Sequence, residues 1–500
     1  MKVVQHVRRW RDDLVVVAAV LVPLAIFTLR ERQIAGAPGF PLDDSWIHLH
    51  FARNLAEGAG FSFNPGTPVA GSTAPLWTLL LAAGALAAGS SLAMAKALGV
   101  GVTAAAALVT RRAALAWGVR PEVALVAAIA LLWTGALAWG ALSGMEVSLA
   151  ALLTAGALLA HARDHTLGTA ACAALAVLAR PEAFLVLVFL VVARPLTVRR
   201  LAMFVVVTIV FLAPAVLFSL ATVGAPYPGT AAAKVEGGLV GWLGGINEPA
   251  TLTWVRRPLA FCREWIVWLA STHWLLPVAL CPALVLVWLR AGRALGLVAV
   301  ALLAHPLGMA LLAPYRGPAF QEGRYSIHLL PLAMLTLAVA VGTRPPPEGR
   351  GRVRALVAAV WLAIAAITLF PAATRYGWAV QNINAMQVHL GRWVDAHLPK
   401  TAPIAVNDIG AIAYFSRREV IDLMGLVTPE IIPYRRQGEG GVIRYVTQVC
   451  PPYLIIFPAW FPQLASRTDT LQPMYRVRLE RNEVAGAAEM VVYRLLRCAV

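Results

Sequence analysis

The sequence predicts a polytopic α-helical membrane protein that carries a water-soluble α/β domain at its C-terminal end. Of its 500 residues, 59% are hydrophobic and only 13% are charged, and the mean hydropathy is +0.71. Apolar runs close to the ~20 helical residues that cross a bilayer recur as far as residue 372 and then stop. We therefore expect a membrane domain over residues 1–372 and an extracytoplasmic α/β domain over residues 373–500.

The formal net charge of +17 comes almost entirely from arginine. In a soluble chain such a charge would indicate nucleic-acid binding. Here the arginine clusters fall in short connections between apolar runs, where they hold loops on the cytoplasmic side of a membrane. The sequence therefore predicts a bilayer as partner and no nucleic acid.

The first apolar run, over 14–29, is expected to be a retained signal anchor. Arg8, Arg9 and Arg11 before it place the N-terminus in the cytoplasm. The charged residues 30–32 follow the run without a small-residue cleavage site. This places the first loop, residues 31–74, on the external face.

The later apolar runs then alternate in direction. The stretch 75–110 is too long for one crossing and ends at Arg111 and Arg112, so we expect one membrane helix and one interfacial helix there. Two of the remaining crossings are identified by where they end: one returns to the inside at Arg163, and one runs outward to Pro314. The others are expected over 122–139, 166–178, 183–192, 201–222, 268–289, 325–341 and 355–370. The connection 342–354 carries the strongest cytoplasmic signal, and the total is about eleven crossings.

The C-terminal part has the alternation of a mixed α/β domain. Residues 383–398 have helical periodicity, and residues 402–415 predict a strand, a turn and a helix. Strands are also expected over 419–425 and 453–457, with a terminal hairpin over 475–479 and 489–495. We expect a small layered domain with part of its sheet parallel, lying on the outer face of the bundle. Cys450 and Cys498 share this domain and could form a disulfide if the domain is exported, but the sequence does not decide whether they do.

Two adjacent carboxylates, Asp43 and Asp44, follow the first crossing in an aromatic-rich segment, residues 40–77. A carboxylate held at a membrane boundary loses solvation, which favours a functional role. The alternative is a helix cap at the start of a helix over about 45–57. Both can hold, because a cap also fixes a carboxylate in place.

An outward-facing recess with carboxylates and arginines suits a substrate with an anionic head and a long apolar tail, such as a polyprenyl-phosphate sugar. Arg180, Lys234 and Arg324 are the cations outside the cytoplasmic clusters that could bind its phosphate. An aspartate can accept the proton of an attacking hydroxyl, and the phosphate leaves once its charge is stabilised. No glycine-rich phosphate loop and no HExxH is present.

Further candidates for the substrate site have simpler alternatives. Glu146 could cap the following helix, Arg180 and Glu182 could form a buried ion pair, and Arg324 could be an interfacial anchor. Asp408, next to a glycine, is better explained as a turn residue. The substrate-binding candidates are Trp46, His48, Arg53, Glu146, Glu182, Tyr227 and Tyr325.

Several segments together resemble the polytopic GT-C glycosyltransferases, particularly the branch of the mycobacterial terminal arabinofuranosyltransferases. They are the Asp43–Asp44 pair with FARNLAEGAGFSFNPG and PLW, then SGME (143–146), LARPE (178–182), PYPGTAAAK (226–234), RYSIHLLP (324–331) and NDIGAIAYFSRREVIDLMGL (407–426). The resemblance implies inverting transfer of a pentose or hexose from a polyprenyl-phosphate donor to a cell-envelope glycan, lipid or protein, on the outer face of the cytoplasmic membrane. It implies that Asp43 is the base, Asp44 a supporting or alternate residue, and Arg324 a phosphate ligand. Segment 226–234 is less aromatic than in relatives, which leaves the sugar and acceptor open.

Two other functional classes fit a charged helical bundle. One is a transporter or flippase, since buried charges also mark substrate paths, but no paired inverted repeats are visible. The other is a non-catalytic scaffold that binds glycan through its outer domain. Two adjacent aspartates could hold a divalent metal. Because arginine can stabilise a phosphate leaving group, we expect neither a metal nor another cofactor to be required.

Overall fold

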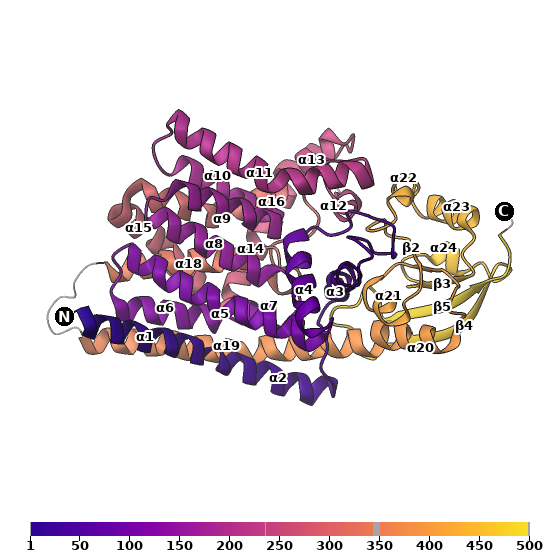
Figure 1. Cartoon of the computed structure of the whole chain (residues 1–500), viewed down its shortest axis with the longest axis horizontal. Coiled ribbons are helices and arrows are strands. Elements are labelled where there is room, and N and C mark those ends of the chain that lie inside the picture. Colours follow the sequence, from indigo (N-terminus) through magenta and orange to yellow (C-terminus); the bar gives the residue numbers. More distant parts are fainter. Residues whose placement is uncertain (1, 236, 344–350, 499–500) are drawn as a thin grey trace.

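The helices from α1 (Lys2–Ala19) to α19 (Gly351–Ile383) form a bundle, and the elements after α19 form an α/β domain at one end of it (Figure 1). The computed structural model describes residues 2–235, 237–343 and 351–498. The N-terminus lies at the far end of the bundle and the C-terminus at the far end of the α/β domain. The predicted class, a helical polytopic protein with a C-terminal α/β domain, is confirmed.

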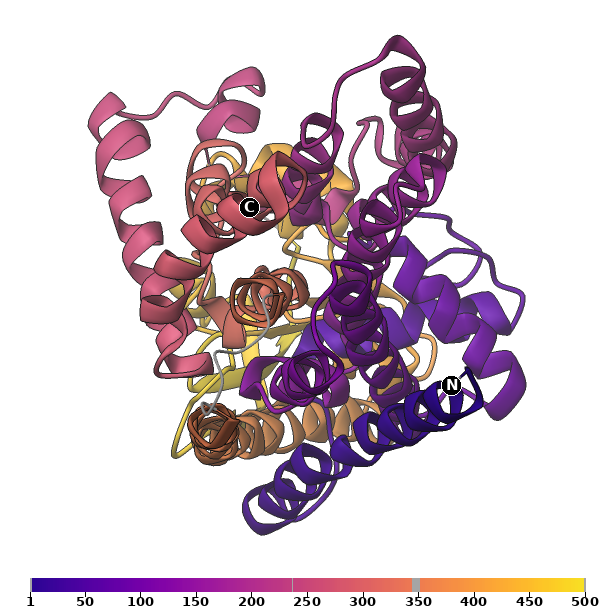
Figure 2. The same ribbon diagram turned by 90° about the vertical axis from the view of Figure 1, so that its left-hand side faces the viewer.

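The helices of the bundle, in chain order, are α1 (Lys2–Ala19), α2 (Leu21–Ala35), α3 (Asp43–Ala56), α4 (Pro75–Ala88), α5 (Leu92–Ala116), α6 (Pro121–Leu132), α7 (Gly135–Leu142), α8 (Val147–Ala162), α9 (Thr166–Ala179), η1 (Pro181–Ala183), α10 (Phe184–Val192), α11 (Val198–Val223), α12 (Gly229–Lys234), α13 (Gly238–Leu243), η2 (Leu252–Arg256), α14 (Arg257–Thr272), α15 (Leu276–Ala299), α16 (Ala301–Leu311), α17 (Phe320–Gly323), η3 (Ile327–Leu329), α18 (Leu330–Gly342) and α19 (Gly351–Ile383). Viewed along the bundle, α1 and α2 lie at one corner and α14 at the opposite one (Figure 2).

Among the described residues, six helices are long and apolar enough to cross a membrane, or seven if the bent pair α6–α7 is one span. The two halves of that pair meet at 59°. Four more apolar helices have 10–17 residues, and the predicted eleven crossings included several of these shorter ones. The expected split of residues 75–110 is found, because α4 ends at Ala88 and α5 begins at Leu92.

Arginines from the predicted cytoplasmic connections lie at the end of the bundle away from the α/β domain. Arg111 donates to Asp12 (2.6 Å) and Asp13 (2.7 Å) and so ties α5 to α1. Arg194 donates to the His161 carbonyl over 2.7 Å, which joins two further connections. The connection 342–354 is also predicted to be cytoplasmic, and its residues 344–350 lie outside the described residues.

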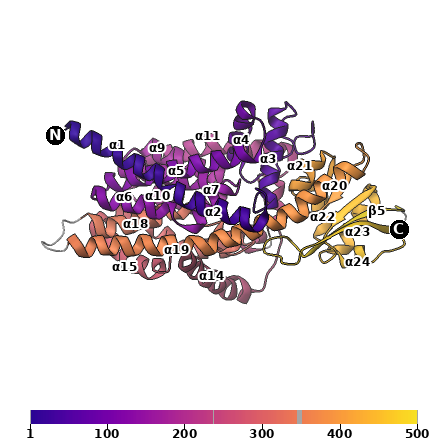
Figure 3. The same ribbon diagram turned by 90° about the horizontal axis from the view of Figure 1, so that it is seen from below.

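The last helix of the bundle continues into the α/β domain without a break. α19 passes into the π-helical turn η4 (Asn384–Val388) and then into α20 (His389–His397), giving 47 residues from Gly351 to His397. Figure 3 shows this helix running along the bundle into the C-terminal domain. The sequence predicts that the last membrane helix stops at residue 370, before Pro371. The helix instead accommodates Pro371, because packing against α2 supports the turns on either side.

The α/β domain contains a five-stranded mixed sheet in the order β2-β1-β3-β5-β4. Its elements after α20 are β1 (Ile404–Val406), α21 (Gly410–Ser416), β2 (Val420–Asp422), η5 (Pro429–Ile431), α22 (Ile432–Arg435), α23 (Glu439–Val449), β3 (Tyr453–Ile456), α24 (Pro462–Ala465), β4 (Leu471–Arg478) and β5 (Glu489–Leu495). β1 pairs in parallel with β2 and β3, whereas β5 is antiparallel to β3 and β4. The expected strands, the terminal hairpin and the partly parallel sheet are all present.

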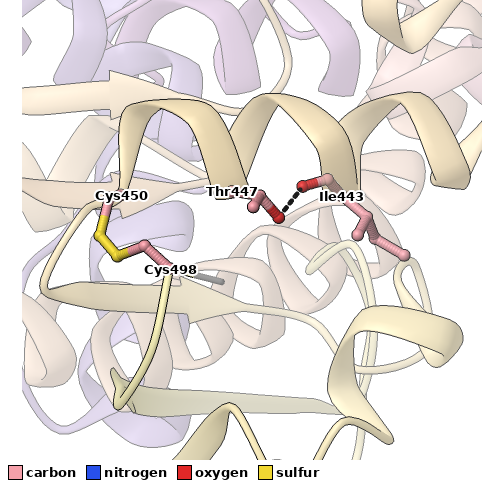
Figure 4. The surroundings of a disulfide bond; sticks show 4 residues. All are labelled: Ile443, Thr447, Cys450 and Cys498. Carbon is pink, nitrogen blue, oxygen red and sulfur yellow. Dashed lines mark hydrogen bonds between the residues drawn. A yellow bond between two sulfur atoms is a disulfide. The ribbon is translucent and has the colours of Figure 1, made fainter. Parts of the chain in front are cut away.

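A disulfide closes this domain. Cys450, which follows α23, is bonded to Cys498 after β5, with Cα atoms 5.5 Å apart (Figure 4). In the same helix, the Thr447 hydroxyl donates to the Ile443 carbonyl over 2.9 Å.

The helix of the loop that is predicted to be external, α3, packs into the core of the α/β domain. Ile47 and Phe51 on α3 belong to the same apolar cluster as Ile404 on β1, Ile412 on α21 and Leu390 on α20. Eleven of its 14 residues are buried. α3 therefore lies between the bundle and the C-terminal domain and places its first turn at their junction (Figure 1).

Candidate active site

Asp43 and Asp44 lie in the first turn of α3 and face different partners. Successive helical residues are rotated by about 100°, so Asp43 and Asp44 cannot point the same way. Leu42 precedes the helix with an extended backbone and gives it no side-chain cap. The roles of the two carboxylates therefore separate at this point.

Asp43 caps a helix that is distant in the sequence. Its carboxylate accepts the backbone N–H of Gly410 (2.6 Å) and of Ala411 (2.7 Å), the first two residues of α21. The predicted cap therefore exists, but on α21 and not on α3. Gly410 is needed for this approach, because a Cβ there would lie 2.1 Å from the Asp43 carbonyl oxygen. Asp43 is only 6% exposed.

A second carboxyl group, Asp408, lies against Asp43. Gln387 in the π-helical turn η4 donates to Asp408 over 2.6 Å. Burial is the main cause that raises the pKa of both Asp43 and Asp408; the negative charge of Asp44 raises the pKa of Asp43 further, and the negative charge of Asp43 raises that of Asp408. The hydrogen bond between them favours a proton on Asp408, which then donates to the Asp43 carboxylate. Asp43 and Asp408 therefore form a buried, hydrogen-bonded carboxyl pair.

Asp44 is paired with cations. Arg324 donates to its carboxylate over 2.8 Å, and the Lys234 ammonium lies 3.7 Å away. Burial alone would raise the pKa of Asp44, but the charges of Lys234 and Arg324 outweigh burial and hold this pKa far below its ordinary value. The Asp44 side chain is 31% exposed, while Arg324 beside it is buried. Asp44 is thus a fixed negative charge at the edge of open space.

A buried charge network adjoins this pair. Arg180 donates to Glu146 and, over 3.1 Å, to Glu182. The second oxygen of Glu146 lies 3.2 Å from His48 Nε2. The ring of Tyr325 lies between two guanidinium groups, 4.7 Å from Arg180 and 5.1 Å from Arg324. The expected ion pair of Arg180 and Glu182 is therefore present and is part of a larger network.

Two cavities meet at Asp44. The larger one, about 770 Å³, lies between the bundle and the α/β domain and is lined by both Asp43 and Asp408. The smaller one, about 180 Å³, is lined by the Arg180 network. The residues common to both cavities are Asp44, Ile47, Lys234, Tyr315, Arg324 and Leu426. The Asp44–Arg324–Lys234 cluster is therefore the wall that the two cavities share.

Nine of the twelve predicted site residues line one or both cavities. They are Asp43, Asp44, His48, Glu146, Arg180, Glu182, Lys234, Arg324 and Tyr325. The other three line neither cavity. Trp46 is buried among aromatic rings, including Phe40 (4.9 Å), and Arg53 donates to the Tyr414 carbonyl over 2.8 Å. Tyr227 is partly exposed in the connection before α12.

Asp408 and Gln387 were not among the predicted site residues. The signal that could have identified Asp408 is its place two residues after β1, since ligands of α/β sheets bind at the carboxyl ends of parallel strands. Among residues 2–235, 237–343 and 351–498, no group of three or more His, Cys, Asp and Glu side chains has the arrangement of a metal site.

Comparisons with known proteins identify the fold. A family model described as a domain of unknown function, DUF8728, matches residues 380–493. No curated protein matches the sequence. Among solved structures, ArnT from Cupriavidus metallidurans bound to undecaprenyl phosphate is 14% identical, with a TM-score of 0.57 over 97% of this chain and 99% of that one.

Two further structures match over most of this chain. AglB, the oligosaccharyltransferase of Archaeoglobus fulgidus, in complex with an inhibitory peptide and a dolichol-phosphate, is 12% identical, with a TM-score of 0.58 over 89% of this chain and 69% of that one. The arabinofuranosyltransferase AftD from Mycobacteria is 17% identical, with a TM-score of 0.51 over 95% of this chain and 40% of its own length. At these identities the likeness concerns architecture, and it leads to one conclusion: the chain has the fold of the polytopic GT-C glycosyltransferases.

Proposed function

We propose that this chain is a membrane glycosyltransferase that transfers a sugar from a polyprenyl-phosphate donor to an acceptor hydroxyl, with inversion at the anomeric carbon. The observation that carries the proposal is the Asp44–Arg324–Lys234 cluster at the wall between two cavities. Such cations can receive a phosphate, and the carboxylates on either side can bind hydroxyl groups and accept a proton. Structures with this fold bound to undecaprenyl phosphate or a dolichol-phosphate support a donor of this class.

In the proposed reaction, Asp43 is the base. The acceptor O–H gives its proton to the Asp43 carboxylate while the acceptor oxygen bonds to C1 of the sugar. The C1–O bond to phosphate breaks, and the phosphate oxygen leaves with the electron pair. The raised pKa of Asp43 makes it a stronger base than Asp44, whose pKa is lowered.

Arg324 and Lys234 are the proposed phosphate ligands. Without donor, the Asp44 carboxylate forms ion pairs with both Arg324 and Lys234. An incoming phosphate competes with Asp44 for the same N–H groups, so Asp44 holds Arg324 in place until the donor arrives. The donor sugar then lies in the smaller cavity. This cavity is lined by Arg180, His48, Glu146, Glu182 and Tyr325.

We propose that neither a metal nor another cofactor is required. The Asp43 oxygens already accept two backbone N–H groups, and Asp44 faces an arginine and a lysine. A divalent cation needs free carboxylate oxygens and would lie against two positive charges here. These residues fit an anion better than a cation.

We also propose that the N-terminus is cytoplasmic and that the C-terminal domain lies outside the cytoplasmic membrane. Disulfides such as Cys450–Cys498 persist in oxidising compartments. The arginine-rich connections gather at the opposite end, as expected of a cytoplasmic face.

The test is transfer in lipid nanodiscs with the purified full-length protein, a panel of short-chain polyprenyl-phosphate pentoses and hexoses, and oligosaccharide acceptors. The proposal expects sugar transfer that D43N abolishes, together with loss of donor binding in R324A. Absence of transfer from every donor, combined with protein-dependent movement of these lipids across the bilayer, would support a flippase instead.

A further inference from the structure

The α/β domain provides one wall of the larger cavity, and this wall has an exposed tryptophan. Trp460 follows β3, is 41% exposed and lines the cavity. None of the donor-side contacts described above involves this residue. An indole left open to a cavity retains apolar surface in contact with water, which a ligand can cover.

The indole of Trp460 is held in a fixed position. Its Nε1–H donates to the Gly486 carbonyl over 3.0 Å, and its ring lies 5.2 Å from the ring of Phe457. A Cβ on Gly486 would lie 2.5 Å from the Trp460 ring and 2.8 Å from Phe457, so glycine makes room for this arrangement. The Trp460 indole is thus ordered before any ligand binds, which lowers the conformational entropy lost on binding.

Two charged side chains line the same cavity as the Trp460 indole. Glu483 lines the same cavity, with its carboxylate 3.0 Å from Arg481 and its backbone N–H held by Asn382 over 2.6 Å. Arg435 also lines the cavity and donates to the Met424 carbonyl. A carboxylate and a guanidinium can accept from and donate to the hydroxyls of a sugar, while the indole covers its C–H face.

We propose that Trp460, Glu483 and Arg435 form a carbohydrate subsite that binds the acceptor glycan on the α/β domain. This inference rests on the proposed function, because it divides the cavity between two substrates. The donor cations Arg324 and Lys234 belong to the bundle, from which a lipid arrives, whereas Trp460 belongs to the domain at the bundle's end. A volume of about 770 Å³ is in the range of cavities that enclose sizeable organic ligands.

The test measures acceptor binding separately from catalysis. Full-length protein in nanodiscs is titrated with fluorescent octyl tetrasaccharides of arabinofuranose, mannose and galactofuranose, and Kd is measured with no donor present. We expect at least one tetrasaccharide to bind, W460A to raise its Kd about tenfold or more, and W460F to recover most of the affinity. M474A is the matched control, because Met474 is similarly exposed on β4 of the same domain but lines neither cavity.

Two further measurements distinguish this subsite from the proposed reaction. In a D43N background, which should lose transfer, adding W460A should still raise the tetrasaccharide Kd about tenfold or more, and W460A alone should bind polyprenyl phosphate as the wild type does. If Trp460-dependent binding occurs and no donor is ever used, the subsite stands and the proposed reaction fails. Equal affinity of W460A and wild type, or no binding of any tetrasaccharide to the wild type, overturns the subsite.

Discussion

Replacing Asp43 with asparagine tests the junction of the two domains and the proposed base together. The aspartate accepts two backbone N–H groups, at 2.6 and 2.7 Å, through its two oxygens. An asparagine keeps one acceptor and turns an NH₂ group toward the other N–H. A lost hydrogen bond to a buried charged acceptor is worth about 1.5–3 kcal/mol, so we expect the first turn of α21 to be destabilised by about 2 kcal/mol.

Hydrogen exchange of the peptide over residues 404–416 reports this loss directly. A destabilisation of about 2 kcal/mol corresponds to roughly 30-fold faster exchange at Gly410 and Ala411. Loss of the base should lower the rate of sugar transfer by about 10²–10⁴-fold. Asp408→Asn is the matched control, because an asparagine there can still donate to Asp43 and accept from Gln387.

We expect D408N to keep wild-type exchange at these two amides and most of the transfer activity. If D43N transfers sugar within threefold of the wild type, Asp43 is not the base. If D43N exchanges as slowly as the wild type, the cap on α21 contributes no stability and the structural reasoning is wrong.

Three other predictions follow from the same contacts. Burial raises the pKa of Asp43 above its ordinary 3.8, and a base acts only when it is deprotonated. The value of kcat/KM should therefore fall as the pH drops, with its midpoint well above pH 4. A midpoint below 3.8 would assign the base to Asp44, whose pKa is lowered. R324K keeps the charge but loses the planar guanidinium that donates to both Asp44 and the Tyr325 hydroxyl, so donor Kd should rise about tenfold or more. R290K should leave donor Kd unchanged, because Arg290 lies on α15 and donates to the Ala340 carbonyl, at the end of α18 away from Arg324. Because the Cys450–Cys498 cross-link spans 48 residues, C450S should destabilise the α/β domain by about 3–4 kcal/mol. A membrane-impermeant reductant should reach this disulfide in intact cells. Protection from that reductant would contradict the proposed orientation.

Much of the fold could be predicted because local chemistry decides it. Residues 402–415 combine an apolar run with NDIG, and they form β1, a turn and α21. The end of the last membrane helix could not be predicted this way. Pro371 normally ends a helix, and only the packing of α2 along α19 explains why it does not do so here.

The site was predictable by residue type, but apart from the neighbouring Arg180 and Glu182 its pairings were not. An aspartate after the first crossing and an arginine before α18 are visible in the sequence, and their 2.8 Å contact is consistent with the expected recess. The contact of Asp43 with Gly410 spans 367 residues, and a single sequence holds no information on such a pair. Asp408 has the sequence pattern of a turn, and only the packing of α3 and η4 against it produces a buried carboxyl pair.

The unbroken helix from Gly351 to His397 ties the chemistry to the thickness of the lipid bilayer. At 1.5 Å per residue its 47 residues extend about 70 Å, whereas the hydrocarbon layer takes up only about 30 Å. Gln387, near its outer end, touches Asp408 directly. A thicker or thinner membrane changes the tilt of such a helix, and any change of tilt displaces Gln387 together with the carboxyl pair. The rate of this protein should therefore depend on acyl-chain length in reconstituted membranes.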